Sequence, residues 1–241
     1  MSWRAATVAG VRRETPTAAT VTLRVPGWPG HDAGQHLDLR LTAEDGYTAT
    51  RSYSIASVPD GEAVEVTVER LSDGEVSPYL TEEVTGGEHV EVRGPVGGWF
   101  VWRPEQKEPV LLVGGGSGVV PLMAVVRRHR ETDSQAMLRL VYSVRDPDSV
   151  LYRDELAGLE RDGIDVRYVF TRKAPPGWPR PPGRLDTDLL AAAAFAPELQ
   201  PTTYVCGPTA FVEYVANLLV GLGHDPSRVR TERFGASGGN R

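Results

Sequence analysis

The 241-residue sequence predicts two parts of different architecture, an all-β part over residues 1–103 and a parallel α/β part over residues 104–241. In the first part, short runs alternate apolar and polar residues, and turn clusters such as PGWPG and VPDG separate them. In the second part, apolar strand-like runs alternate with helix-like runs, which is typical of a parallel sheet wrapped by helices. A polar, proline-flanked stretch, WRPEQKEP at 102–109, predicts the boundary between the two parts.

Five short runs rich in Val, Leu, Tyr and Thr predict the strands of the first part. They lie at residues 17–25, 36–41, 51–56, 63–71 and 89–94. Short strands at this spacing favour a closed barrel or a sandwich. One helical piece, VSPYLTEEV at 76–84, interrupts them, and Pro78 is tolerated there because it falls in a first helical turn.

The second part begins with a continuous apolar run, PVLLVGGGSG at 109–118, which predicts a buried strand that ends in glycine. Amphipathic runs predict the helices that follow, and apolar runs predict the remaining strands. The expected helices are 119–131, 149–163, 186–195 and 208–223, and the expected strands are 138–144, 164–170, 202–206 and 229–234.

Charge and cysteine content exclude several classes of protein. The net charge of −6 argues against bulk nucleic-acid binding. Residues 1–108 carry 10 basic and 17 acidic side chains, a net charge of −7, whereas residues 109–241 carry 16 and 15, a net charge of +1. The second part is therefore the better place for an anionic ligand.

Cys206 is the single cysteine, so the chain cannot build a disulfide, a zinc site or a cysteine-held iron–sulfur cluster by itself, and we predict no metal. The N-terminal stretch MSWRAATVAGVRRE has no long apolar run. We therefore expect no signal peptide, no membrane contact and a cytoplasmic location.

Two glycine-containing turns of the second part predict a ligand site. In LLVGGGSGVVPLMA, at 111–124, a strand ends in glycines and a helix opens, which directs backbone N–H groups and a helix dipole at one point. Such a turn suits a pyrophosphate, although a tight turn without a ligand is the alternative. It matches neither G-x-G-x-x-G, because Val119 takes the last place, nor a P-loop. YVCGPTAFVE, at 204–213, repeats the arrangement, and Cys206 is either part of this site or a small buried side chain.

Two arginines follow the next two strands, Arg145 in YSVRDPDS and Arg172 in FTRKAP. In a dinucleotide site an arginine at this place accommodates a ribose 2′-phosphate. Two solvated surface arginines are an equally open interpretation.

The all-β part contributes RSYSIAS at 51–57 and LSDGEVSPYL at 71–80. Arg51 is suited to clamp a phosphate, Tyr53 to lie against a planar ring, and Ser54 to donate to a ring nitrogen. The N–H groups at Val76 and Ser77 are suited to a second phosphate. Each residue taken separately is also compatible with an ordinary strand surface.

Taken in order, RSYS, DGEVS, GPVGGWF, GGGSGVVP and CGPTAF resemble the ferredoxin–NADP reductase superfamily over almost the whole chain, from AGQHLDLRL to TERFG. The resemblance implies an N-terminal antiparallel β-barrel flavin domain followed by a parallel α/β nucleotide-binding domain. It also implies FAD and a nicotinamide cofactor, NADP or NAD, with a preference for NADPH because Thr171 and Arg172 lie where relatives place Ser-Arg. FAD is chosen over FMN by the resemblance alone.

The resemblance assigns most site residues. Ser54 and Cys206 are the candidate catalytic residues, at flavin N5 and at the nicotinamide end. The flavin-binding candidates are Arg51, Ser52, Tyr53, Ser54, Val68, Glu69, Gly74, Glu75, Val76, Ser77, Gly94 and Phe234. The nicotinamide-nucleotide candidates are Gly114, Gly115, Gly116, Ser117, Gly118, Pro121, Ser143, Arg145, Thr171, Arg172, Cys206, Gly207 and Pro208.

The resemblance implies that hydride passes from NAD(P)H to the flavin and that electrons leave to a separate acceptor such as a ferredoxin, because the chain has no cysteines for a fused iron–sulfur domain. The basic run RRHR, at 127–130, is either a docking patch for that partner or a favourable charge at a helix end. Three alternatives stay open: a diaphorase acting on quinones or free flavin, a non-catalytic flavin- and nucleotide-binding redox module, and an NAD-dependent dehydrogenase without flavin.

Overall fold

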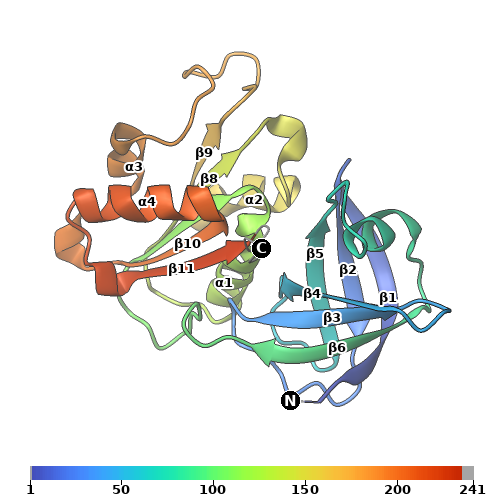
Figure 1. The fold of residues 1–241 in the computed structure, drawn as a ribbon. Helices are drawn as coiled ribbons and strands as arrows, with labels where there is room; N and C mark the ends of the chain where they lie inside the picture. The colour runs from blue at the N-terminus through green and yellow to red at the C-terminus, as the bar shows by residue number, and fades with distance from the viewer. Residues whose placement is uncertain (1, 235–241) are drawn as a thin grey trace, which may run out of the picture. The chain divides into compact units, whose positions relative to one another are not determined.

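The computed structural model describes residues 2–234, except for the side chain of residue 160 (Figure 1). The chain forms two compact units. The first unit comprises the chain up to Arg103 together with Met123–Thr132, and the second comprises Pro104–Leu122 and the chain from Asp133 onward. The helix α1, Val119–Glu131, therefore contributes its first residues to the second unit and its remainder to the first.

The first unit is built on one six-stranded sheet in which neighbouring strands run antiparallel (Figure 1). The strands follow the order β4-β3-β6-β1-β2-β5 across the sheet. Their bounds are β1 Arg4–Thr15, β2 Ala18–Arg24, β3 His36–Thr42, β4 Thr48–Ser54, β5 Ala63–Glu69 and β6 His89–Val96. Five of these strands match the runs expected from the sequence.

The strand β1 is not among the runs expected from the sequence. Ala6 and Val8 are buried at alternate positions, but the second half of the strand carries exposed residues, among them Arg12 and Arg13. Its ladder with β2 runs from Thr7 to Thr15 with two register shifts. Backbone pairing therefore holds this half of the strand in place, and no apolar alternation marks it in the sequence.

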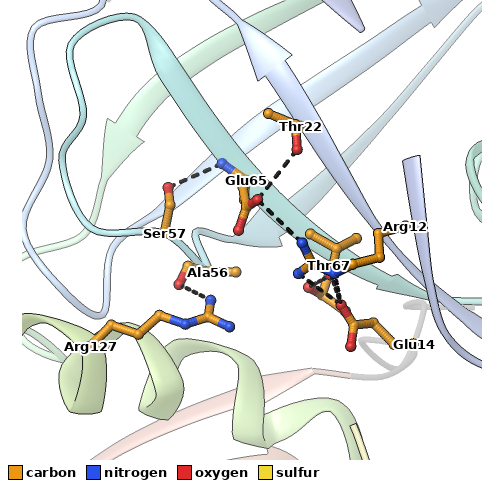
Figure 2. Close-up of polar contacts among 9 residues, drawn as sticks. Arg12, Glu14, Thr22, Ala56, Ser57, Glu65, Thr67 and Arg127 are labelled. Carbon is orange, nitrogen blue, oxygen red and sulfur yellow. Dashed lines mark hydrogen bonds and ion pairs between the residues drawn. The ribbon is translucent and has the colours of Figure 1, made fainter. Parts of the chain in front are cut away.

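The sheet closes on itself just after β4. Ile55 forms a bridge with Val66 of β5, and the Ala56 N–H donates to the Glu65 carbonyl at 2.8 Å. The Glu65 N–H in turn donates to Ser57 Oγ at 3.1 Å (Figure 2). This seam makes the sheet a barrel, so the barrel prediction is confirmed and the sandwich is excluded.

Apolar side chains at alternate strand positions fill the barrel. Those with no exposed area include Val21, Leu23, Leu37, Leu39, Val64, Val66 and Val92. Burying one such side chain stabilises a fold by roughly 1.5–3 kcal/mol. On the opposite face of β2 and β5, Thr20 and Thr67 form a cross-strand pair whose hydroxyls are 2.7 Å apart, and Thr20 also donates to the Glu14 carboxylate at 2.6 Å.

The helix expected over 76–84 is found as a single π-helical turn, Tyr79–Glu83 (η1). The Val84 N–H donates to the Tyr79 carbonyl five residues back, at 2.9 Å. Leu80, inside this wide turn, and Val84, directly after it, both belong to the barrel core.

The second half of α1 packs within the first unit. Arg127 donates from Nη1 to the Ala56 carbonyl at 2.7 Å, next to the seam (Figure 2). The His129 ring lies 5.7 Å from the buried ring of Trp102, and Arg128 pairs with Glu131 at 2.5 Å. The RRHR run is thus engaged largely inside the unit, which favours a structural role over the docking patch.

The second unit contains a five-stranded parallel sheet with the order β11-β10-β7-β8-β9 (Figure 1). The strands are β7 Val110–Gly115, β8 Leu138–Val144, β9 Asp165–Phe170, β10 Thr202–Pro208 and β11 Val229–Phe234. The α/β prediction is confirmed. The order reverses between β7 and β10, and in open α/β sheets a ligand lies at the carboxyl ends of the strands at such a point.

Three helices accompany α1: α2 Arg153–Leu159, α3 Thr187–Ala193 and α4 Thr209–Gly221. The helix expected from Ser149 starts later, because Asp146 caps a separate short turn there and Tyr152 has a φ of 54°. Across residues 2–234, the helices are all too short or too polar to span a bilayer.

Candidate functional site

The strand β4 carries its polar side chains on two faces. Its register against β3 places Arg51 and Tyr53 on the face of the core residues Leu39 and Leu37, and Tyr53 packs against the barrel core. Burial raises the pKa of the Tyr53 hydroxyl, so the ring stays neutral, although the Arg51 charge opposes the shift. Among the strands described, β4 has a ladder partner along one side only, except at the seam.

The serines of β4 lie on the other face. Ser52 donates to Asp38 Oδ1 at 2.6 Å, and Arg93 donates to Asp38 Oδ2 at 2.6 Å. Burial disfavours ionisation of Asp38, but these hydrogen bonds outweigh it and lower its pKa. Ser54 pairs in register with His36, and burial lowers the pKa of that imidazole. The structure therefore groups Arg51 with Tyr53, and it groups neither with the Ser52 hydroxyl.

The loop between β5 and η1 is a tight turn next to Arg51. The Leu71 N–H donates to Ser77 Oγ at 3.0 Å, and the Gly74 N–H donates to the Leu71 carbonyl at 3.0 Å. A Cβ on Gly74 would lie 2.7 Å from Ser77 Oγ, so a larger residue there would displace the hydroxyl that accepts from Leu71. Glu75 reaches Arg51, with 3.3 Å between Oε2 and Nη2.

The remaining barrel candidates are spread over other elements. Val68 and Glu69 end β5, and Val76 is fully buried in the core. Gly94, on β6, is closely packed, because a Cβ there would lie 3.1 Å from both Leu37 and Trp28. A packing requirement accounts for that glycine without a ligand.

In the second unit, β7 runs into a short 3-10 turn, Gly116–Gly118 (η2), and then into α1. Gly116 has a φ of +57°, and no atom lies within 4 Å of a Cβ built on it. Gly118 is different, because its Cβ would lie 2.1 Å from the Cys206 carbonyl oxygen. The turn is thus packed on one side and open at Gly116, with the first N–H groups of α1 beside it. Backbone groups arranged in this way suit an anion such as a pyrophosphate.

The turn after β10 lies beside this one, as expected. Cys206 pairs with Gly114, and the ring of Phe211 would collide with a Cβ on Gly115 or on Gly207, at 2.7 and 2.8 Å. Pro208 caps α4. Glycines at these positions let the two turns approach each other closely.

Cys206 and Glu232 are paired in register on β10 and β11. Burial raises the pKa of the Cys206 thiol, and the Glu232 charge adds to the effect. Burial also raises the pKa of Glu232 to about 7. Two groups that hold a proton near neutral pH therefore stand side by side. Sequence reasoning missed Glu232, although an acid inside a predicted strand, VRTERF, was the available signal.

Phe234 pairs with Pro208 at the end of β11. It is the last residue that the structure describes, and the tail GASGGNR lies outside the described residues.

The ends of β8 and β9 bring the two candidate arginines together. The Arg172 N–H donates to the Arg145 carbonyl at 2.9 Å, and the Thr171 N–H donates to the Val144 carbonyl at 2.8 Å. Both arginines are exposed. Ser143, two residues before Arg145 on β8, is buried and pairs with Gly115 of β7. This edge therefore combines a glycine turn with positive charge, which suits a nucleotide phosphate.

Each unit thus offers residues that suit one cofactor. The barrel presents the neutral ring of Tyr53 and the guanidinium of Arg51 on one face of β4, a strand that pairs with β3 along one edge. This arrangement suits a flavin and its phosphates. The sheet presents a glycine turn that is open at Gly116 and leads into the start of α1, together with two arginines, which suits a nicotinamide dinucleotide.

Comparisons with known proteins agree with this assignment. The family model of the oxidoreductase FAD-binding domain matches residues 18–101, and that of the oxidoreductase NAD-binding domain matches residues 112–217. Ferredoxin–NADP reductase B of Sorangium cellulosum is 32% identical over 84% of this chain and 85% of its own length.

Another relative is longer than this chain. The glycine betaine monooxygenase reductase subunit of Pseudomonas aeruginosa is 31% identical over 84% of this chain, but the match covers only 56% of the relative, so the chain spans about half of that protein. The FAD/NAD-binding domain of nitric oxide dioxygenase from Vibrio cholerae has the same fold, with a TM-score of 0.85 and 24% identity over 97% of this chain and 99% of that one. The chain therefore belongs to the ferredoxin–NADP reductase superfamily, with an oxidoreductase FAD-binding domain followed by an oxidoreductase NAD-binding domain.

Proposed function

We propose that this chain oxidises NADPH through FAD and delivers the electrons to a separate protein of the ferredoxin type. The observation that carries the proposal is the presence, in one chain, of the Arg51–Tyr53 face and the glycine edge of β7 and β10. The relative from Pseudomonas aeruginosa supports the acceptor, because its name describes the reductase subunit of a monooxygenase.

On the barrel, Arg51 would bind the flavin phosphates and Tyr53 would pack against the isoalloxazine ring. Ser54, at the end of β4, would orient the ring through N5, while the backbone around Gly74 and Val76 would face the phosphates. When bound, the flavin accepts a hydride from the nicotinamide and yields electrons singly or in pairs. The contribution of the chain is alignment, since most of the rate comes from holding the reacting groups in register.

On the parallel sheet, the backbone N–H groups at Gly116–Gly118 would bind the dinucleotide phosphates, with the N-terminus of α1 behind them. Arg172 and Arg145 would bind the 2′-phosphate, which favours NADPH over NADH. Cys206 and Gly207 would line the nicotinamide end. Glu232, half-protonated near pH 7, would hold a proton beside Cys206 without adding a full negative charge.

The test is a visible spectrum of the purified protein, followed by anaerobic titration with NADPH and with NADH. We expect a flavin spectrum that NADPH bleaches at lower concentration than NADH. Turnover with a ferredoxin and with a small quinone then separates the protein acceptor from a diaphorase. A colourless protein that takes up no added FAD would overturn the proposal, and bleaching without turnover on either acceptor would indicate a non-catalytic module.

A further inference from the structure

Two donors of the barrel converge on one carboxylate. Glu75 Oε2 accepts from Arg51 Nη2 at 3.3 Å, and Glu75 Oε1 accepts from the Tyr47 hydroxyl at 3.0 Å. Each oxygen of the carboxylate therefore has its own donor. Both members of the ion pair are about half exposed, with 50% of the Arg51 side chain and 54% of the Glu75 side chain accessible.

The backbone of each of the three residues is held by its own segment. Tyr47 belongs to a turn fixed by its own hydrogen bonds, from the Tyr47 N–H to Asp45 Oδ1 at 2.9 Å and from the Ala43 N–H to the Tyr47 carbonyl at 2.8 Å. Arg51 is anchored on β4, where its Nη1 donates to the Thr50 carbonyl at 2.7 Å. Glu75 lies between the tight turn at Gly74 and the buried Val76, so its backbone is held while its half-exposed side chain reaches Arg51 and Tyr47.

The pair of donors is one that a phosphate would also use. A guanidinium and a hydroxyl bind phosphate oxygens and carboxylate oxygens in the same way, with charge-assisted hydrogen bonds. The hydrogen bond to Glu75 raises the pKa of the Tyr47 phenol, which keeps it a donor. A flavin phosphate at Arg51 would meet the negative charge of Glu75 and would replace it on both donors.

We propose that Glu75 is an internal competitor of the flavin phosphate for Arg51 and Tyr47, which weakens the binding of the flavin. The inference rests on the proposed role of Arg51 in flavin binding. It gives Glu75 an effect opposite to that of a direct ligand, because removing its charge strengthens flavin binding. The effect is small, since exposed ion pairs of this kind change an equilibrium by about two- to fivefold.

The experiment compares dissociation constants for FAD and riboflavin in the wild-type chain and in three variants, Glu75→Gln, Glu75→Ala and Glu82→Gln. Glu82 is a matched control, because it forms an ion pair with Arg70 on the same unit, its side chain is 44% exposed, and its replacement changes the net charge equally. Riboflavin is the second probe because it has no phosphate. We expect both Glu75 variants to bind FAD two- to fivefold more tightly, with riboflavin binding and the Glu82 variant unchanged.

The outcomes separate this inference from the proposed function. If the wild-type chain binds FAD and the Glu75 variants bind it equally or more weakly, the competitor role is wrong, but the proposed reductase function is not affected. If riboflavin binding tightens as much as FAD binding, the effect does not involve the phosphate and the inference is overturned. If the wild-type chain binds no flavin, the proposed role of Arg51 in flavin binding is wrong, and the competitor role of Glu75 is wrong with it.

Discussion

The barrel and the parallel sheet build their candidate sites by different means. On the barrel the site consists of side chains, above all Arg51 and Tyr53, that project from a strand whose backbone would tolerate other residues. On the sheet it consists of backbone groups at glycines, and Gly118 has no room for even one more carbon. Affinity on the barrel can therefore change one side chain at a time, whereas the glycine edge of the sheet is inseparable from the fold.

The largest expected effect is that of Gly118→Ala. The added Cβ would lie 2.1 Å from the Cys206 carbonyl oxygen, which is backbone and cannot rotate away. We expect the free energy of unfolding to fall by about 3 kcal/mol or more, measured by chemical denaturation. Gly158→Ala, in α2, is the control, because its nearest neighbour would be the Arg161 guanidinium at 3.7 Å. It should gain about 0.5–1 kcal/mol from helix propensity. Equal denaturation midpoints for Gly118→Ala and Gly158→Ala would show that the sheet tolerates a side chain at Gly118 and would contradict the contrast with the barrel.

The second prediction concerns Glu232 and pH. Burial raises the pKa of Glu232 from its ordinary value of 4.5 to about 7 in the folded chain, so between these values the folded state binds more protons than the unfolded state. Its contribution to the free energy of unfolding therefore falls as the pH rises from 4.5 to 7, by about 2–3 kcal/mol. Glu232→Gln should remove this part of the pH dependence. Glu213→Gln, at an exposed position, should keep it, and identical pH profiles for wild type and Glu232→Gln would show that the pKa of Glu232 is not raised.

The third prediction sharpens the account of the barrel. Arg51→Ala should weaken FAD binding about tenfold or more, because a charge-assisted hydrogen bond contributes roughly 1.5–3 kcal/mol, while the melting temperature stays close to that of the wild type. Equilibrium dialysis followed by absorbance of the retained flavin measures the loss. Arg24→Ala is the control, since Arg24 forms an exposed ion pair with Glu62 on the same barrel. Full retention of flavin by the Arg51 variant would show that Arg51 does not bind the flavin phosphates.

The smallest effect is expected at Arg172. Arg172→Ala should raise the KM for NADPH about five- to tenfold and leave the KM for NADH nearly unchanged, because only NADPH carries the 2′-phosphate. Steady-state kinetics with both nucleotides measures the ratio. Arg167→Ala, on β9 beside Asp165, should leave the ratio unchanged. A ratio that stays constant in the Arg172 variant as well would exclude the 2′-phosphate role.

Much of the fold could be predicted because local pattern and tertiary packing agree. The continuous apolar run before Gly114 and the alternation in β2 and β5 are both direct consequences of which faces are buried. The second half of β1 could not be predicted in the same way, because hydrogen bonds to β2 hold it rather than burial of apolar side chains.

The candidate site was less predictable than the fold. Alternation along β4 is enough to place Arg51 and Tyr53 on a different face from Ser52. The glycine turn after β7 can be recognised directly in the sequence, as GGGSG. The pairing of Cys206 with Glu232 is not visible, since it depends on β10 and β11 being neighbours in the sheet. The contact of Glu75 with Arg51 likewise requires the loop after β5 to fold back on β4.

The second half of α1 has a practical consequence. The barrel could be taken for a module that ends at Arg103, but Arg127 donates to Ala56 beside its seam and His129 covers Trp102. A fragment cut at that position would lose both contacts and uncover an indole that is only 1% accessible. Anyone dividing this protein for expression or for grafting onto another reductase must carry the later helix along with the earlier strands.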